Sequence, residues 1–137
     1  MSAQLLLVHG DDGFGLDSAV RDFAAAIGAS TTLEIVPERL PDEGAIDRAR
    51  LEAGTVGMFD MHLAVLRQPL RAAGRSTAAA ERLLALAGEL PDGSSLALVE
   101  ERPSRDLAKP PALLKRLAEA VTARGGRVEQ HDAPRRG

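Results

Sequence analysis

A glycine-rich segment near the amino terminus has the spacing of a loop that binds nucleotide phosphates. Its outer glycines, Gly10 and Gly15, form the pattern G-x-x-x-x-G directly after an apolar run. A working loop of this type continues with Lys, which reaches the β- and γ-phosphates, and then with Ser or Thr, which binds Mg²⁺. Leu16 and Asp17 occupy those two positions here. The segment therefore has the spacing of a phosphate loop without the side chains that hold a triphosphate.

The acidic residues of this segment also oppose triphosphate binding. Asp11, Asp12 and Asp17 place up to three negative charges around the loop. Two like charges about 6 Å apart repel each other by roughly 1 to 3 kcal/mol at an effective dielectric of about 20 to 60. An ordinary turn explains the same residues, because glycine tolerates positive φ and aspartate caps a helix. We expect the loop to bind neither ATP nor ADP, and we expect no cofactor or metal ion.

The other residues with reactive side chains do not complete a catalytic or metal-binding site. Glu100 and Glu101 follow a predicted strand and resemble the carboxylate pair of a nucleotide-hydrolysing site, but without a phosphate-loop lysine we expect a solvated strand end. Phosphoacceptor receiver domains need Asp at the end of the third strand, where this chain has Arg67. The histidines at positions 9, 62 and 131 are widely separated and lack the spacing of metal ligands.

One enzymatic alternative is a small α/β-hydrolase. The run Leu5–Gly10 is similar to the oxyanion loop of that class, and His131 could act as the late catalytic histidine. The class also needs a nucleophile on a sharp turn between a strand and a helix. The nearest candidate is Ser76, but residues 69–73 before it do not form a strand pattern, so we expect Ser76 to cap a helix.

Alternating strand and helix patterns surround these residues. The run Gln4–His9 is continuously apolar, which is typical of a strand covered on both faces in a parallel sheet. The other expected strands are Thr31–Val36, His62–Leu66, Ser95–Val99 and Arg127–His131, and the expected helices are Leu16–Ile27, Glu43–Ala53, Ser76–Leu90 and a last helix from Pro110–Pro111 to Gly125. This order predicts one three-layer α/β domain over residues 1–137, with a mainly parallel five-stranded sheet, an internal first strand and a last strand near an edge.

Composition limits the classes of function. The net charge is −3, and the only basic cluster without nearby acids is Arg135 and Arg136, so direct binding of duplex DNA is disfavoured. Because there is no cysteine, no disulfide can form. The apolar runs are far shorter than the roughly 20 residues that span a membrane, and no signal peptide is recognisable. We therefore expect a cytoplasmic protein that does not contact membranes.

Three stretches in order resemble the N-terminal domain of the delta subunit of bacterial DNA polymerase III, a component of the clamp loader. The first is LLLVHGDDGFGLDSAV, the second is GMFDMHLAVLRQP, and the third runs from Arg105 through PALLKRLAEAVTARGGRVEQH. The matching positions of the first stretch are Gly10, Asp11, Asp12, Phe14, Leu16 and Val20. Gly13 and Gly15 make its loop richer in glycine than the family pattern. The family continues through a helical domain and a collar domain, so the resemblance covers one of its domains.

The resemblance implies a P-loop NTPase-like fold of the AAA+ type with a degenerate nucleotide site and no enzymatic activity of its own. It also implies binding to the sliding clamp, the beta subunit, during DNA replication. The clamp-binding element falls on Met58 and Phe59, with Val56 and Met61 beside them. Contacts with other clamp-loader subunits would use regions outside this chain, and contact with DNA would be indirect.

The residues alone leave the clamp-binding assignment open. A Phe between a helix and a strand is more often a core residue, whereas Gly54, Gly57 and Asp60 favour a protruding turn. Met and Phe suit insertion into an apolar pocket. A third alternative is a degenerate nucleotide-binding domain that acts only as a structural scaffold.

Overall fold

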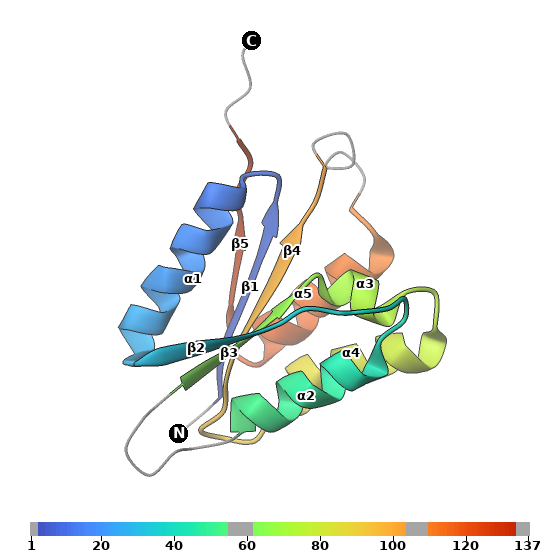
Figure 1. Ribbon diagram of the computed structural model, residues 1–137, viewed down its shortest axis with the longest axis horizontal. Coiled ribbons are helices and arrows are strands. Elements are labelled where there is room, and N and C mark those ends of the chain that lie inside the picture. Colours follow the sequence, from blue (N-terminus) through green and yellow to red (C-terminus); the bar gives the residue numbers. More distant parts are fainter. Residues whose placement is uncertain (1–2, 55–61, 104–109, 134–137) are drawn as a thin grey trace.

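The computed structural model describes residues 3–54, 62–103 and 110–133, and within them the chain forms one five-stranded, all-parallel sheet (Figure 1). The strands are β1 (Gln4–Gly10), β2 (Thr31–Ile35), β3 (His62–Arg67), β4 (Ser95–Glu101) and β5 (Arg127–Gln130). Their order across the sheet is β2-β3-β4-β1-β5. The predicted parallel sheet is confirmed, with β1 inside it and β5 at an edge.

Helices cover both faces of this sheet. The helices of the described part are α1 (Gly13–Ile27), α2 (Glu43–Gly54), α3 (Pro69–Ala73), α4 (Thr77–Glu89) and α5 (Ala112–Ala123). Figure 1 shows α1 alone on one side of the sheet and the other four helices on the opposite side. The predicted three-layer α/β architecture is therefore confirmed.

Two apolar layers explain why β1 is continuously apolar. Leu6 and Val8 pack in the layer under α1, whereas Leu5 and Leu7 pack in the larger layer under the other helices. Successive side chains of a strand point to opposite faces, so a strand between two helical layers needs apolar residues at every position. β1 is also internal in the sheet, because β4 and β5 pair with it on either side.

Several element boundaries have local causes that the sequence predicts. Asp42 Oδ1 accepts a hydrogen bond from the Ala45 amide at 3.1 Å, and Ser76 Oγ accepts one from the Ala79 amide at 3.1 Å. These bonds satisfy amide groups at the starts of α2 and α4. Gly28 ends α1 with a φ of 77°, a conformation that favours glycine.

Most boundaries differ from the prediction by one or two residues, and three differences affect the chain at the carboxyl ends of β1, β3 and β4. α1 begins at Gly13 rather than Leu16, so Asp17 lies beyond its first turn. β4 continues two residues past Val99, to Glu101. The short helix α3 was not predicted. It has Pro69 in its first turn and follows Gln68, whose φ of 54° turns the chain sharply out of β3.

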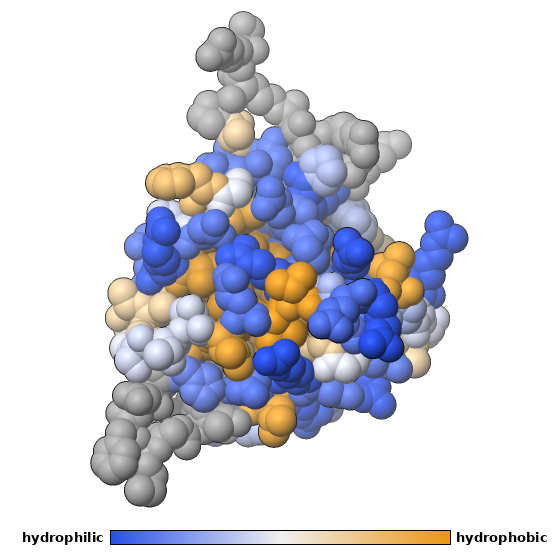
Figure 2. All heavy atoms as spheres, viewed as in Figure 1, coloured by the Kyte–Doolittle hydropathy of each residue, from blue (hydrophilic) through white to orange (hydrophobic). Residues whose placement is uncertain are grey.

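Few large apolar residues are exposed in the part of the chain that the structure describes. Figure 2 shows apolar side chains in the middle of this face, bordered on most sides by hydrophilic ones. The large apolar residues that are exposed in the described part are Phe14, Val36, Leu40 and Leu51. No helix within residues 3–54, 62–103 and 110–133 is long and apolar enough to cross a membrane.

Candidate functional site

A crevice of about 600 Å³ lies at the carboxyl ends of the parallel strands. Its lining residues are Asp11, Val36, Arg67, Gln68, Glu101, Arg102 and Pro103. The neighbouring strands β1 and β4 continue into helices on opposite faces of the sheet (Figure 1). Open α/β sheets bind ligands at such a switch point. This crevice is therefore at the place where open α/β sheets bind ligands.

The connection from β1 to α1 is too short to wrap around a phosphate. β1 ends at Gly10 and α1 begins at Gly13, so Asp11 and Asp12 alone join them. Leu16, which stands at the position of the phosphate-loop lysine, is 1% exposed and packs between α1 and the sheet. A side chain at this position is directed into the core and away from the crevice.

Carboxylates of the protein itself occupy the amino end of α1. Asp12 Oδ1 accepts a hydrogen bond from the Gly15 amide at 3.1 Å. Both carboxylate oxygens of Glu101 would lie 3.4 Å from a Cβ added at Gly13. A helix amino terminus favours anions, and here side-chain carboxylates already supply that negative charge.

The segment after β5 crosses directly over this connection. The Asp12 amide donates to the His131 carbonyl at 3.1 Å, and the Ala133 amide donates to Asp11 Oδ1 at 2.7 Å. Gly10 has a φ of 135°, and a Cβ at Gly10 would lie 2.1 Å from the His131 carbonyl oxygen. The close approach of this segment therefore requires glycine at position 10 without reference to any ligand.

An ion-pair cluster joins three elements beside the crevice. Arg67 Nη2, at the end of β3, lies 2.9 Å from Asp17 Oδ1 on α1 and 2.6 Å from Glu34 Oε1 on β2. Asp17 thus forms an ion pair with Arg67. The two partners lie 50 and 33 residues from Arg67 in the sequence, so local patterns carry no signal of this cluster.

Glu100 is buried, and the prediction of a solvated strand end is wrong for this residue. Its carboxylate accepts hydrogen bonds from the Leu70 amide at 3.0 Å and from Gln68 Nε2 at 3.1 Å. Gln68 Nε2 also donates to the Glu101 carbonyl, and Gln68 Oε1 accepts from the Glu101 amide at 2.8 Å. β4 is central in the sheet and α3 folds back over its end, which removes Glu100 from water. Glu101 is exposed, as predicted.

Burial raises the pKa of Glu100 to about 7. The hydrogen bond from the Leu70 amide and the positive charge of Arg102 favour the ionised carboxylate, and they offset only part of this rise in pKa. Desolvation disfavours the charged form of a carboxyl group, which is the physical cause of the rise. Glu100 therefore gains or loses a proton near neutral pH.

This raised pKa predicts that the free energy of unfolding falls as the pH rises. Because the folded pKa lies above the ordinary value, the contribution of Glu100 is fully present below the ordinary pKa and is lost as the pH rises through about 7. We expect Glu100 to lower the free energy of unfolding by on the order of 2 kcal/mol between pH 5 and pH 8. Glu100→Gln should remove this component, as measured by urea unfolding at the two pH values. Glu101→Gln is the matched control and should keep the pH dependence of the parent. Equal pH dependence in the parent and Glu100→Gln would contradict this assignment.

The three histidines do not form a common site. Burial, followed by the nearby charge of Arg102, lowers the pKa of His9. His62 Nε2 lies 2.7 Å from the Glu52 carbonyl oxygen, and His131 Nε2 lies 2.9 Å from Glu129 Oε1. Within the described ranges, no group of three or more His, Cys, Asp or Glu residues could hold a metal ion.

The structure does not bring the residues of the hydrolase alternative together. Ser76 caps α4, and its chain follows the carboxyl end of β3, whereas His131 follows β5. β4 and β1 lie between those strands, so β3 and β5 are separated by three strand spacings, about 14 Å. No observation at Ser76 favours a nucleophile.

The expected clamp-binding residues Val56, Met58, Phe59 and Met61 lie outside the described residues. The residues on either side are fixed by the fold: Gly54 ends α2, and His62 begins β3. The His62 contact with the Glu52 carbonyl ties these two elements together. His62 begins β3 at its amino end, and the crevice lies at the carboxyl ends of the strands.

Sequence reasoning did not identify Gln68 or Arg102 as parts of this region. Gln68 connects the ends of β3 and β4, and the only local signal is that it precedes a proline. Arg102 is 7% exposed, and its amide donates to the Gly10 carbonyl at 2.8 Å.

No protein-family model matches the chain, and no curated protein sequence matches it.

Proposed function

We propose that this chain is a non-catalytic domain of the clamp-loader delta type, which binds the DNA polymerase sliding clamp and helps to open it during DNA replication. Its partner is the sliding clamp, and other clamp-loader subunits would contact regions outside this chain. It has no catalytic residues and no nucleotide cofactor in this proposal. The proposal combines the delta-like sequence stretches with a fold that has the place for a nucleotide but not the means to hold one.

The strand order supports the AAA+ part of this proposal. β4 lies between β1 and β3, an order that differs from those of the Rossmann and flavodoxin folds. A strand inserted at this place is the arrangement of AAA+ P-loop domains. The β1–α1 connection also lies where the phosphate loop of such a domain would lie.

The observation that carries the proposal is the two-residue connection from β1 to α1. A chain with this topology and a working site would be an ATPase, because its phosphate loop and crevice would hold ATP. Here α1 begins directly after Asp12, and Leu16 is buried under it. The same features match the delta-type stretch, in which the acidic residues precede the helix. A binding role is therefore the best-supported function of the fold.

Sedimentation velocity tests the binding role directly. The chain mixed with the sliding clamp of the same organism should sediment as a faster complex, and the complex should form without nucleotide. Separate boundaries for the two proteins at tens of micromolar would contradict the proposal. That result would favour the scaffold alternative, in which the fold has no partner among the clamp proteins.

A further inference from the structure

One edge of the sheet, formed by β2, is open. Within the described ranges β2 pairs only with β3, and no strand lies on its outer side. The outward amide and carbonyl groups of Thr31–Ile35 have no hydrogen-bond partner among the described residues. In Figure 1, β2 lies at the front of the sheet between α1 and α2. An edge strand of this kind is a template for pairing with another strand.

The other edge, formed by β5, is protected. β5 has four residues, and its charged side chains Arg127 and Glu129 pair with each other at 2.8 Å. Short strands and charged side chains are common means by which proteins prevent pairing at an edge. β2 has five residues, and its one charged side chain, Glu34, pairs with Arg67 on the neighbouring β3. Of these two edges, β2 is therefore the one suited to pairing.

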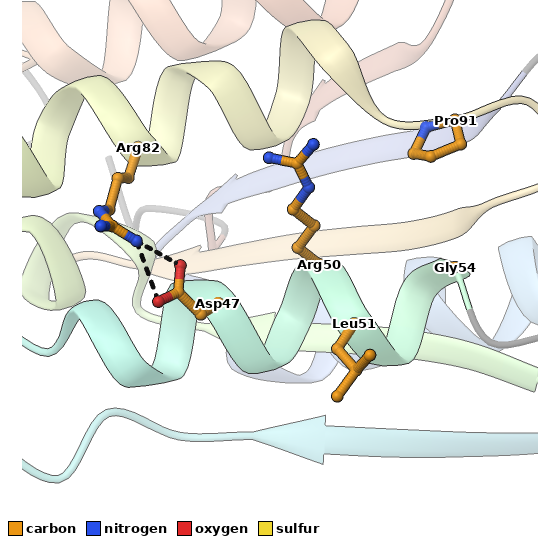
Figure 3. Close-up of a pocket in the computed structure, with 6 residues that line it drawn as sticks. All are labelled: Asp47, Arg50, Leu51, Gly54, Arg82 and Pro91. Atoms are coloured by element: carbon orange, nitrogen blue, oxygen red, sulfur yellow. Dashed lines mark hydrogen bonds and ion pairs between the residues drawn. The ribbon is translucent and has the colours of Figure 1, made fainter.

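Exposed apolar side chains flank the open edge. Val36, directly after β2, is 58% exposed, and Leu51 on α2 is 68% exposed. Figure 3 shows Leu51 directed away from Arg50 and Pro91, to the side of α2 on which β2 runs. The apolar area in the middle of Figure 2 lies along β2. A strand added at this edge would remove these side chains from water.

Two opposite charges lie on this same side of α2. Arg48 lines a small hollow together with Ile35 and Val36, at the end of β2. Glu52 is four residues after Arg48 and Leu51 is three residues after it, so both neighbour Arg48 on the helix surface. Neither Arg48 nor Glu52 has an ion-pair partner among the described residues. A helix side with one free charge of each sign is complementary to an antiparallel copy of itself.

One two-fold axis perpendicular to the sheet places both features against their copies. It runs β2 antiparallel to β2 of a second copy, which joins the two sheets, and it runs α2 antiparallel to the second α2. α2 packs over β2 and β3, so the two α2 helices would lie roughly 10 to 14 Å apart, about two to three strand spacings. Long side chains bridge this distance, and Arg48 of each copy comes opposite Glu52 of the other.

The register of the two strands follows from their side chains. Leu33 and Ile35 are two residues apart and therefore point to the same face, where Ile35 packs in the layer under α2. Pairing Leu33 with its copy brings two half-buried leucines together at the axis. It also sets Thr32 opposite Glu34, which keeps its pair with Arg67, so like charges are not directly opposed.

We infer that this chain forms a two-fold symmetric homodimer in which β2 pairs antiparallel with β2 of a second copy and Arg48 of each copy pairs with Glu52 of the other. The charges of α2 select a second copy over an unrelated strand, because the same helix side supplies both members of the ion pair. Leu33, Val36 and Leu51 supply the apolar part of the interface.

A charge exchange on α2 tests the inference, with sedimentation equilibrium of the chain alone as the measurement. Arg48→Glu and Glu52→Arg should each weaken dimerisation at least about tenfold, because two symmetric ion pairs become repulsive. The combined variant has opposite charges again and should return to within about threefold of the parent. Arg50→Glu is the matched control: it makes the same charge change on the other side of α2 (Figure 3) and should change the dissociation constant less than about threefold. Circular dichroism checks that each variant folds.

Amide hydrogen exchange locates the interface independently. The outward amides of Thr31–Ile35 should exchange more slowly at high than at low protein concentration, because pairing with a second copy protects them. The amides of Arg127–Gln130 on the other edge should exchange at the same rate at both concentrations.

All of these measurements use the chain alone, so they are independent of clamp binding. A chain that stays monomeric up to millimolar concentration would overturn the inference. A combined variant that dimerises as weakly as the single variants, or an Arg48→Glu variant that dimerises as tightly as the parent, would show that the α2 charges do not meet. Concentration-dependent protection of β5 instead of β2 would place the interface at the other edge and would also contradict the inference.

Discussion

Alanine at both Met58 and Phe59 is expected to weaken binding to the sliding clamp by about a hundredfold or more. Burial of two such side chains in an apolar pocket contributes roughly 3 to 6 kcal/mol before the costs of association. A loss of about 1.4 kcal/mol corresponds to a tenfold change in affinity. Surface plasmon resonance with immobilised clamp measures the change. The melting temperature should remain close to that of the parent, because in this proposal the side chains contact the partner and not the core.

A matched control uses another exposed phenylalanine. Phe14 is 77% exposed in the first turn of α1, which follows the carboxyl end of β1. Phe14→Ala should leave clamp binding unchanged. If the double variant of Met58 and Phe59 binds as tightly as the parent, these residues are not part of the interface. A double variant that unfolds would place Phe59 in the core.

Gly10→Ala is expected to lower the free energy of unfolding by about 2 to 4 kcal/mol. A non-glycine residue in a conformation of this kind costs about 1 to 3 kcal/mol, and here the added Cβ also meets the His131 carbonyl oxygen at 2.1 Å. The segment after β5 would have to move away from the β1–α1 connection. Urea unfolding monitored by circular dichroism measures the loss.

Gly88→Ala is the control for this substitution. Gly88 lies in α4, and a Cβ added there would meet nothing within 4 Å. Alanine is a better helix former than glycine by about 0.8 to 1 kcal/mol, so Gly88→Ala should be neutral or stabilising. If Gly10→Ala is as stable as Gly88→Ala, the segment after β5 does not approach Gly10 closely in solution.

The sequence predicts the elements whose causes are local. The apolar run before Gly10 predicts an internal strand, because a strand with helices on both faces needs apolar side chains throughout. Asp42 and Ser76 mark helix starts, since each accepts a hydrogen bond from an amide three residues later. These signals depend on neighbouring residues and so can be recognised without the fold.

Features that depend on distant residues could not be predicted in this way. Two adjacent glutamates after a strand are typical of a solvated strand end. Glu100 is nevertheless buried, and its carboxylate accepts hydrogen bonds from Gln68 and Leu70. These partners lie 32 and 30 residues away in the sequence. Helix α3 has five residues, too few for a periodic pattern. The pairing of Asp17 with Arg67 likewise exists only once the sheet and α1 are assembled.

The candidate site was predictable in one respect and not in another. The sequence shows that Leu16 and Asp17 replace the residues that a phosphate loop needs. It does not show that α1 begins at Gly13, which shortens the connection, or that Asp12 and Glu101 place carboxylates at the helix start. Those features come from the close packing of β1, β4 and the segment after β5.

Calorimetric titration of this chain with the sliding clamp, in the presence and absence of Mg²⁺-ATP, tests the central claim most directly. We predict saturable binding of the clamp with the same dissociation constant in both conditions, and no heat of binding when ATP is titrated into the chain alone at up to millimolar concentration. Absence of clamp binding, a requirement for ATP, or saturable ATP binding at tens of micromolar would contradict the account.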